Sequence, residues 1–388
     1  MKKGDNVQHY SLGNSAPKEW QVFIKKLYNM NSLKNTTIHQ IINNLERAGA
    51  QILVRQLHEA LLFNGIDSRL VSLTAFSSSE PITYQSLGFF ECYNLRAIAA
   101  LYAYIKNNCK PNDIIHVHLF PAMLYVSLAV RLTGWQGTLI CTEHNTHNRR
   151  RNRYIGKIID SILYSRYRKI ICISKGTKDA LVTWMPSLRP KLSIISNGIP
   201  LTYNRFPIRQ FREKPIIISV GSLSKQKNYD IAIRAMHLIS DIDYEYWIAG
   251  EGSEEDNLKS LCKSLNLDKK IRFLGLIEDV PSLLKEADIF LMPSLWEGFG
   301  LAAVEAMNAG LPLIVSDVPG LREIVASLEE CALLVPPNEP HRISQAVREL
   351  LINPDKRVIF GKNAYLRSSA FSIEETIENH IKFYSTIH

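Results

Sequence analysis

The sequence of 388 residues lacks any long uninterrupted apolar run. No uncharged apolar stretch approaches the roughly 18–20 residues that a membrane-spanning helix needs. The beginning of the chain carries two lysines but no apolar core, so it does not resemble a secretory signal. We therefore expect a cytoplasmic protein, long enough to form two domains with a sizeable core.

Paired cysteines and a complete dinucleotide fingerprint are lacking as well. The six cysteines are scattered without a C-x-x-C pair, and we expect them all to be reduced thiols. Gly49 has no third glycine at dinucleotide spacing after it, and the turn at Gly250 also lacks its third glycine. A nicotinamide-binding fingerprint is therefore absent.

Residues 288–316, DIFLMPSLWEGFGLAAVEAMNAGLPLIVS, are the most informative stretch that is present. The apolar run Ile289–Met292 predicts a buried strand, and Gly300–Ala309 predicts a helix that ends before a Gly and a Pro. Leu313–Val315 predicts the next buried strand. A strand, loop, helix and strand in this order indicate an α/β domain with a parallel sheet.

This stretch holds groups that suit a sugar nucleotide. Its apolar helix carries Glu305, and a buried carboxylate is costly unless a partner pairs with it. Glu297 lies in the loop at a strand's carboxyl end, where open α/β sheets bind ligands. The amides of Phe299, Gly300 and Leu301 lie at a helix N-terminus, which suits a phosphate. The alternative is a structural helix with a salt-bridged Glu305 and a solvent-exposed Glu297.

The pattern E-G-F-G-L-x-x-x-E-A-M-x-x-G-L-P, which contains Glu297 and Glu305, resembles the E-x7-E motif of retaining GT-B glycosyltransferases, the glycosyl transferases group 1 family. The resemblance covers about residues 36–388. It implies two doubly wound, Rossmann-like α/β domains that face each other across a cleft. It also implies that Glu297 contacts hydroxyls of the donor sugar and that Glu305 contacts the donor ribose.

Two glycine turns extend the resemblance. Gly49 matches the second glycine of a family turn that approaches the donor phosphates, although Ala48 replaces the first glycine. The turn at Gly250 matches a family turn that borders the donor.

A lysine-containing turn resembles the family's diphosphate clamp. Gly221-Ser-Leu-Ser-Lys-Gln-Lys227 is similar to the family's G-R-L-x-x-x-K, which implies that Lys227 binds the donor diphosphate. Ser222 stands where the family has an arginine. Lys225 is the candidate to supply that missing charge, but as a point charge without the fork of an arginine.

Histidines follow two predicted strands of the first domain. His144 comes just after the strand Leu139–Thr142, and the resemblance implies that it lies beside the transferred sugar. For His118 an acceptor-site role and a core role remain open, and His116 is interpreted as a core residue. No fourth ligand accompanies the H-x-H and H-x-x-H patterns, so we predict no metal site.

A basic run extends from Arg149 to Lys169 and is predicted to form one amphipathic helix. One interpretation is a helix packed on its sheet with a solvated charged face. The other is a surface for anionic lipid head groups. We assign Arg149 and Arg150, at its start, to acceptor binding.

The domain boundaries follow from these elements and from the resemblance. Residues 1–35 form an N-terminal extension, 36–200 the acceptor-binding domain, and 201–214 the linker. Residues 215–370 form the nucleotide-sugar domain, and residues 371–388 a helix that crosses back to the first domain. Residues 74–92 are predicted to be a loop. The D-x-D pattern at Asp241 and Asp243, a metal–diphosphate motif in the other large glycosyltransferase class, precedes its strand and is interpreted as a turn.

The expected activity is transfer of a sugar, with retention, from a nucleotide-diphosphate sugar to a glycan or a polyprenyl-diphosphate-linked acceptor. We favour a UDP-sugar as donor, no cofactor and no divalent metal, and a role in polysaccharide biosynthesis, in lipopolysaccharide or capsule. We expect peripheral contact with the anionic inner face of the cytoplasmic membrane, and no nucleic acid as partner. The alternatives are a sugar-nucleotide 2-epimerase of the same fold or a non-catalytic protein that binds nucleic acid or another anion, as the net charge of +9 allows.

Overall fold

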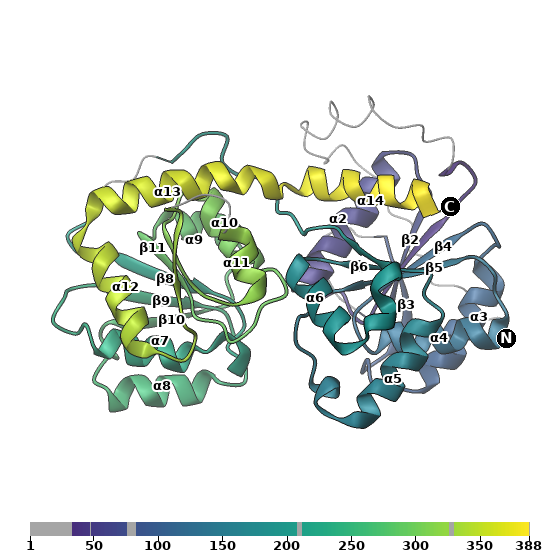
Figure 1. Cartoon of the computed structure of the whole chain (residues 1–388), viewed down its shortest axis with the longest axis horizontal. Coiled ribbons are helices and arrows are strands. Elements are labelled where there is room, and N and C mark those ends of the chain that lie inside the picture. The colour runs from purple at the N-terminus through teal and green to yellow at the C-terminus, as the bar shows by residue number, and fades with distance from the viewer. Residues whose placement is uncertain (1–32, 47, 76–82, 208–211, 326–329, 388) are drawn as a thin grey trace, which may run out of the picture.

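The chain forms two α/β domains that are joined by a linker and by a helix near the C-terminal end (Figure 1). The computed structural model describes residues 33–46, 48–75, 83–207, 212–325 and 330–387. The predicted N-terminal extension lies almost entirely outside the described residues.

A seven-stranded parallel sheet forms the centre of the first domain, with the order β3-β2-β1-β4-β5-β6-β7. Its strands are β1 (Ile38–Ile42), β2 (Ser68–Thr74), β3 (Gln85–Phe89), β4 (Ile114–His118), β5 (Thr138–Glu143), β6 (Lys169–Cys172) and β7 (Leu192–Ile194). The strand order reverses between β1 and β4, and open sheets bind ligands at the carboxyl edge beside such a point. His118 and His144 both lie at this edge.

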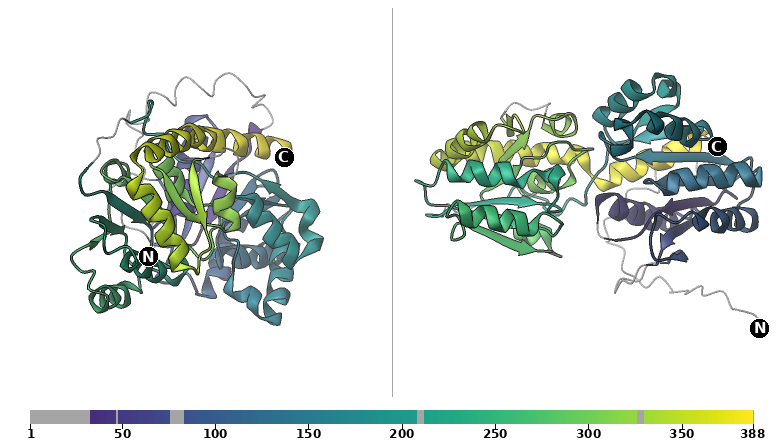
Figure 2. Two further views of the ribbon diagram at one scale, coloured as in Figure 1. Left: turned by 60° about the vertical axis from the view of Figure 1, so that its left-hand side comes forward. Right: turned by 90° about the horizontal axis from the view of Figure 1, so that it is seen from below.

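Helices cover both faces of this sheet, as Figures 1 and 2 show. One face carries α3 (Arg96–Asn108), α4 (Ala122–Thr133) and α5 (Tyr154–Ser165), and the other carries α2 (Gly49–Phe63). The remaining helical segments are η3 (Arg149–Asn152), α6 (Lys175–Trp184) and η4 (Pro186–Lys191). Strands buried on both faces explain the near-continuous apolar runs that predicted them.

The second domain is built on a six-stranded sheet with the order β10-β9-β8-β11-β12-β13. Its strands are β8 (Ile216–Val220), β9 (Glu245–Ala249), β10 (Ile271–Gly275), β11 (Ile289–Met292), β12 (Leu313–Ser316) and β13 (Ala332–Val335). One face is covered by α7 (Tyr229–His237), α8 (Glu255–Ser264) and α12 (Pro340–Ile352), and the other by α9 (Val280–Lys285), α10 (Leu301–Asn308), α11 (Pro319–Val325) and α13 (Pro354–Ser368). The short η5 (Lys225–Lys227) follows β8. This arrangement confirms the predicted pair of doubly wound domains.

The chain crosses between the domains twice, at two adjacent points. After α13 the short η6 (Ser369–Phe371) leads into α14 (Ile373–Ile387), which lies on the first domain beside α2 (Figure 1). The amide of Ile199 donates to the carbonyl of Phe371, and the amide of Ile373 donates to the carbonyl of Ile199, both at 2.9 Å. The two crossings are therefore hydrogen-bonded to each other. The predicted return helix is confirmed in its position.

Two local predictions were wrong. Residues 74–92 contain β3, an edge strand whose residues are only partly buried, so its sequence has no clear apolar alternation. The basic run from residue 149 to residue 169 is not one helix, because the chain is extended at Arg153 between η3 and α5. The residues of α5 that face the core are Gly156, Asp160, Leu163 and Tyr164, whereas Ile155 and Ile158 are exposed.

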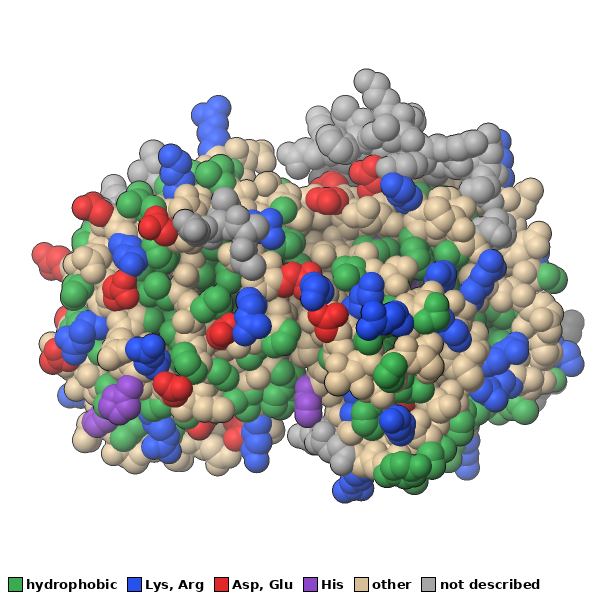
Figure 3. Space-filling model, viewed as in Figure 1, with side chains coloured by type: hydrophobic (Ala, Val, Ile, Leu, Met, Phe, Trp, Pro, Cys, Tyr) green, Lys and Arg blue, Asp and Glu red, His purple; other side chains and the backbone are tan. Residues whose placement is uncertain are grey.

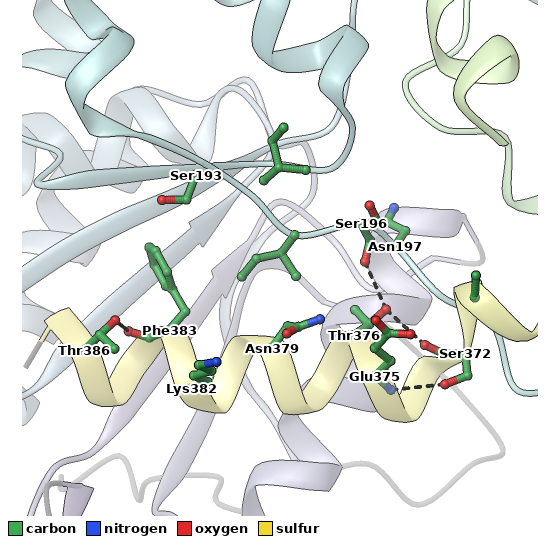
Figure 4. A pocket seen from close by; sticks show the side chains of 13 residues that line it. Ser193, Ser196, Asn197, Ser372, Glu375, Thr376, Asn379, Lys382, Phe383 and Thr386 are labelled. Atoms are coloured by element: carbon green, nitrogen blue, oxygen red, sulfur yellow. Dashed lines mark hydrogen bonds between the residues drawn. The ribbon is translucent and has the colours of Figure 1, made fainter. Parts of the chain in front are cut away.

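A cavity of about 410 Å³ lies between the edge strand β7 and α14. Figure 4 shows that α14 supplies one wall, with Asn379, Lys382 and Phe383, and that Ser193 and Ser196 lie on the other. None of the predicted site residues lines this cavity.

Candidate functional site

The N-termini of two helices from different domains meet at the cleft. Gly49 is the first residue of α2 and Leu301 is the first residue of α10. A methyl group placed on Gly49 would lie 2.8 Å from Cδ1 of Leu301, so the starts of the two helices are in close proximity. Neither helix has a side chain that caps its first turn. Two helix starts without a side-chain cap thus lie close together, which is an arrangement that suits a phosphate group.

The turn before α10 requires its glycine. Gly300 has a φ of 103°, and a Cβ there would lie 2.5 Å from Cδ2 of Leu321. Phe299 is buried, with its ring edge-on to Phe371 at 5.5 Å. Core packing therefore fixes the backbone that carries the predicted anion cradle.

Glu297 lies at the mouth of this cradle and is buried rather than solvent-exposed. Its Oε1 accepts from Lys227 Nζ at 2.5 Å and from Ser294 Oγ at 2.8 Å. The sequence predicted these two residues to bind the donor at different groups, and the structure brings them together as an ion pair. An anionic ligand would compete with Glu297 for Lys227.

The predicted diphosphate turn lies next to this ion pair. Gly221 has a φ of 152°, and a Cβ there would lie 3.1 Å from Cε of Lys227. Gly250 stacks its backbone on Gly221, since a Cβ on Gly250 would lie 2.1 Å from the Gly221 carbonyl oxygen. Ser222 and Lys225 are exposed on the same turn. The glycines therefore allow two loops to approach each other below the candidate phosphate site.

Glu305 lies on α10, one turn into the helix, and is partly buried. Burial raises the pKa of its carboxyl, and no basic side chain pairs with it among the described residues. The predicted alternative, a structural salt bridge at Glu305, is therefore not what the described residues show. A carboxyl that is shielded from water and lacks a cation suits a ligand hydroxyl.

His144 begins the loop after β5 and is 8% exposed. Burial lowers the pKa of its imidazole to about 4, although the neighbouring Glu143 opposes this shift. The His144 carbonyl faces the second domain so closely that a Cβ on Gly298 would lie 2.0 Å from its oxygen. His118 is buried next to His144. Its Nδ1 lies 3.4 Å from His144 Nε2, and its Nε2 lies 2.9 Å from Gln40 Oε1.

A small pocket of about 150 Å³ opens beside His144 in the first domain. Arg150 lines it, with its guanidinium 4.5 Å above the ring of Phe120 and 2.5 Å from Asp160. Burial lowers the pKa of Arg150, but Glu143 and Asp160 outweigh this effect and raise it. The structure thus places Arg150 and His144 on one pocket. Arg149 lies in η3, and its side chain is outside the described parts.

The prediction of a solvated or lipid-facing charged face was wrong for Arg150, whose side chain is directed inward and pairs with Asp160. Only 9% of the Arg151 side chain is exposed, and it pairs with Glu143 at 3.1 Å and with Asp160 at 3.6 Å. These two arginines are therefore internal ion-pair partners rather than a solvated or lipid-facing surface.

Family models cover both domains of the chain. The model of Glycosyltransferase Family 4 matches residues 36–203, and the model of Glycosyl transferases group 1 matches residues 202–367. The chain belongs to the glycosyl transferases group 1 family.

Curated relatives and a solved structure agree with this family. A galactosyltransferase of Escherichia coli, named for UDP-Gal and α-D-GlcNAc-diphosphoundecaprenol, is 28% identical over 58% of this chain and 63% of its own length. An uncharacterised glycosyltransferase of Methanocaldococcus jannaschii is 31% identical over 51% of this chain and 56% of its own length. The match thus spans less than two thirds of either relative. The Anabaena HepE protein, solved with UDP and glucose, superposes with a TM-score of 0.78 at 17% identity, over 90% of this chain and 100% of its own. This likeness shows the GT-B fold.

The D-x-D pattern lies far from the ligand edge of this GT-B fold. Asp241 pairs with Arg348 at 2.6 Å and Asp243 with Lys214 at 3.7 Å, before β9 begins. Its interpretation as a turn is confirmed. In the described part of the chain, no group of three or more His, Cys, Asp or Glu side chains could hold a metal ion.

The residues that hold the two domains together at the site were not predicted from the sequence. Thr146 Oγ1 donates to the Glu297 carbonyl at 3.0 Å, and Ser174 Oγ donates to the Gly298 carbonyl at 2.6 Å. The His147 ring lies 4.8 Å from that of Trp296. Thr146 and Ser174 each follow a strand's carboxyl end, and this shared position is the only signal that could have pointed to them.

Proposed function

We propose that this protein is a retaining glycosyltransferase that moves a sugar from a nucleotide-diphosphate sugar, with UDP favoured, to a lipid-linked acceptor. The observation that carries the proposal is the meeting of two uncapped helix N-termini, at Gly49 and Leu301, beside the Lys227–Glu297 pair. Membership of the family supports the reaction class. The E. coli relative named for a diphosphoundecaprenol-linked acceptor supports the acceptor class, and the similar Anabaena structure with UDP supports the nucleotide.

The donor diphosphate would lie between the two helix N-termini. Lys227 would leave Glu297 and bind a phosphate oxygen, with Lys225 as a second cation on the same turn. Glu297 would then accept from hydroxyls of the donor sugar, and Glu305 would accept from the ribose. The helix amides and lysines carry the charge of the leaving group, so we propose that no divalent metal and no cofactor are required.

The position of Glu297 supports the proposal of retention without a covalent intermediate. Its carboxylate is fixed on the second-domain side by Lys227 and Ser294, beside the phosphate cradle. From there it cannot attack the anomeric carbon from the opposite face, as a double displacement needs. The acceptor hydroxyl would instead attack from the side of the leaving group. The bond from carbon to phosphate oxygen breaks as the new C–O bond forms, and the leaving diphosphate takes the acceptor proton.

A surface of the first domain suits contact with a membrane. Tyr154, Ile155 and Ile158 on α5 are exposed by 84%, 61% and 52%, with Arg153 and Lys157 exposed between them. We call these five residues the α5 ridge. Figure 3 shows the right-hand part of one face, in the first domain, with blue basic side chains and few red acidic ones among the described residues. Apolar side chains flanked by cations fit the interface of an anionic bilayer.

This ridge begins three residues after Arg150, which lines the small pocket beside His144. A protein bound through α5 would therefore hold its acceptor pocket near the head groups, where the sugar of a lipid-linked acceptor lies. No helix among the described residues is long and apolar enough to cross a bilayer.

The test is incubation with UDP-, GDP- and ADP-sugars, with and without a polyprenyl-diphosphate-linked glycan. We expect slow donor hydrolysis alone and faster transfer with the acceptor, both undiminished in chelator. Proton NMR of the first product formed reads the anomeric coupling, which should match that of the donor. An inverted product, a glycosyl group trapped on Glu297, or activity that is lost in chelator would overturn the mechanism.

A further inference from the structure

A chain of buried polar side chains links His144 to the C-terminal helix. His144 Nε2 lies 3.4 Å from His118 Nδ1, and His118 Nε2 lies 2.9 Å from Gln40 Oε1 on β1. Gln40 Nε2 donates to the hydroxyl of Tyr384 on α14 at 3.0 Å. That hydroxyl lies 2.7 Å from His116 Nδ1, whose Nε2 lies 2.7 Å from Oγ1 of Thr142. We call these residues the imidazole chain. All of them are buried.

The amide of Gln40 sets the direction of every hydrogen bond in this chain. Its Oε1 can only accept, so His118 Nε2 carries the proton. Burial lowers the pKa of His118 well below its ordinary value and that of His144 to about 4, so both rings are neutral at neutral pH. A neutral His118 with a protonated Nε2 has a lone pair on Nδ1. His144 must therefore donate from Nε2, and its own Nδ1 is unprotonated.

The other half of the imidazole chain is consistent with the same direction. The Gln40 Nε2 group donates to Tyr384, so the Tyr384 hydroxyl is free to donate to His116 Nδ1. His116 then donates from Nε2 to Thr142. If the Gln40 amide were reversed, every bond in the chain would reverse too, and His144 would carry its proton on Nδ1.

We propose that Tyr384 and Gln40 are positioning residues for His144, and that they hold its imidazole as the Nε2–H tautomer with Nδ1 as an acceptor toward the substrate. Among the described residues, Nδ1 of His144 makes no hydrogen bond, and the ring lines the pocket beside Arg150. An unprotonated nitrogen there accepts a hydroxyl hydrogen of a bound sugar, whereas an N–H would not. This inference rests on the proposed function for what His144 contacts. It gives α14 a role in the site besides joining the two domains.

Nitrogen-15 NMR of the full-length protein labelled at histidine tests the tautomer directly, because protonated and unprotonated ring nitrogens have separate chemical shifts. We expect His144 to show a protonated Nε2 and an unprotonated Nδ1. Tyr384→Phe removes the hydroxyl between Gln40 and His116 but keeps the buried ring. The Gln40 amide then loses its partner on α14, and the nitrogen shifts of His144 should move toward a mixture of tautomers.

The kinetic expectation for Tyr384→Phe is a fall in kcat of about 3- to 10-fold, the usual effect of one lost hydrogen bond. KM for the donor should stay within about twofold, since Lys227 and the helix N-termini are untouched. Tyr167→Phe is the matched control, because Tyr167 is also fully buried in the first domain and donates to the Met123 carbonyl at 2.7 Å, outside the chain. It should change neither kcat nor the shifts of His144. If Tyr384→Phe folds poorly, Gln40→Met is a second variant, because methionine is similar in length to glutamine but has no amide. It should cause the same change in the His144 nitrogen shifts.

A protonated Nδ1 on His144 in the unmodified protein would overturn the inference. Unchanged His144 shifts in both Tyr384→Phe and Gln40→Met would overturn it as well. The tautomer is read without any sugar donor, so the two proposals fail separately. If no nucleotide sugar is turned over by the unmodified protein, the proposed function is wrong whatever the shifts show.

Discussion

The two domains share one architecture but differ in charge. Residues 36–200 hold 19 lysines and arginines against 9 aspartates and glutamates, whereas residues 215–370 hold 16 against 22. The domain to which we assign the acceptor is therefore basic, with a net charge of +10, against −6 for the other domain. The acidic domain is the one to which we assign the anionic donor. Donor binding must then rely on a few local groups, namely helix amides and Lys227, rather than on the field of the whole domain.

The two domains also differ in how their internal charged side chains are paired. In the first domain, Arg150 pairs with Asp160, and Arg151 pairs with Glu143 and Asp160. In the second domain, Glu305 has no cation beside it among the described residues, and Glu297 holds Lys227 through a single ion pair that a phosphate could break. Charges in the first domain build the fold, and those at the cleft edge of the second are available to a ligand.

The largest effect should come from breaking the α5 ridge. Replacing Tyr154, Ile155 and Ile158 by glutamine, together with Arg153→Gln and Lys157→Gln, should abolish sedimentation with anionic vesicles. Each basic residue near such a surface contributes about 1 kcal/mol, and apolar side chains that enter the interface contribute about as much each or more. Since all five side chains are exposed, thermal unfolding should change little.

The second domain supplies the control for this experiment. Ile352, Val358 and Ile359 are also exposed apolar residues on helices, and changing all three to glutamine should leave vesicle binding intact. If the unmodified protein does not sediment at low salt, or if the control variant loses binding equally, the α5 ridge is not a membrane surface.

Lys227→Ala should produce the next largest effect, on the donor site. It removes a charge-assisted bond to phosphate, worth roughly 1.5–3 kcal/mol, and we expect UDP to bind about 10- to 150-fold more weakly. Ser222→Ala is the neighbouring control and should cost ~1 kcal/mol, or about fivefold. Calorimetric titration of both variants with UDP measures the difference. Equal losses would mean that the diphosphate is held elsewhere.

Site residues were easier to predict from the sequence in the second domain than in the first. The run from Glu297 to Glu305 carries a family motif, with its G-F-G-L core, that indicated two carboxylates and a helix N-terminus at one edge. By contrast, the sequence pattern gave the wrong direction for the first-domain arginines. A basic run with apolar residues at helical spacing predicts one amphipathic helix, and only tertiary contacts with Asp160 and Glu143 turn Arg150 and Arg151 inward.

Other elements could not be predicted because their local signal is weak. The strand β3 is a half-exposed edge strand, and α6, α7, α8, α11 and β13 were not identified from sequence. Most of these are short or carry many polar residues, and they are fixed by packing on a neighbouring sheet. Contacts between distant segments, such as Gln40 with Tyr384, have no sequence signal at all without the fold.

Glu305→Gln should have a smaller effect than Lys227→Ala, with UDP bound about tenfold more weakly through the lost ribose contact. The fold should not suffer. Burial raises the pKa of Glu305, so the folded state holds this proton more tightly than the unfolded chain does. Ionisation of Glu305 therefore costs stability as the pH rises above its unfolded value of about 4.3.

Glu305→Gln removes the cost of ionising a buried carboxyl, because glutamine does not ionise. It should match the unmodified protein in stability near pH 4 and become relatively more stable as the pH rises toward 7. Thermal unfolding across this range gives the curve, and UDP titration at pH 7 gives the affinity. A variant that is destabilised at pH 7 yet binds UDP normally would make Glu305 a structural partner and restore the alternative interpretation.

The smallest effect should come from a substitution in the D-x-D pattern. It distinguishes a metal-dependent diphosphate site from one that is built on helix amides and lysines. In a metal-dependent site, loss of one aspartate would abolish donor binding. Here Asp241 lies at the amino end of β9, and its carboxylate pairs with Arg348 on the surface. The ligand edge is at the other end of the same strand, beside Gly250. Asp241→Asn should therefore leave UDP affinity and sugar transfer unchanged within error, with or without chelator, and exposed ion pairs contribute little to stability. Arg348→Gln, which removes the same pair from the other side, should behave identically. If Asp241→Asn alone lost UDP affinity, this carboxylate would take part in donor binding. The conclusion that the acidic domain binds its donor only through local groups, namely helix amides and Lys227, would then be wrong.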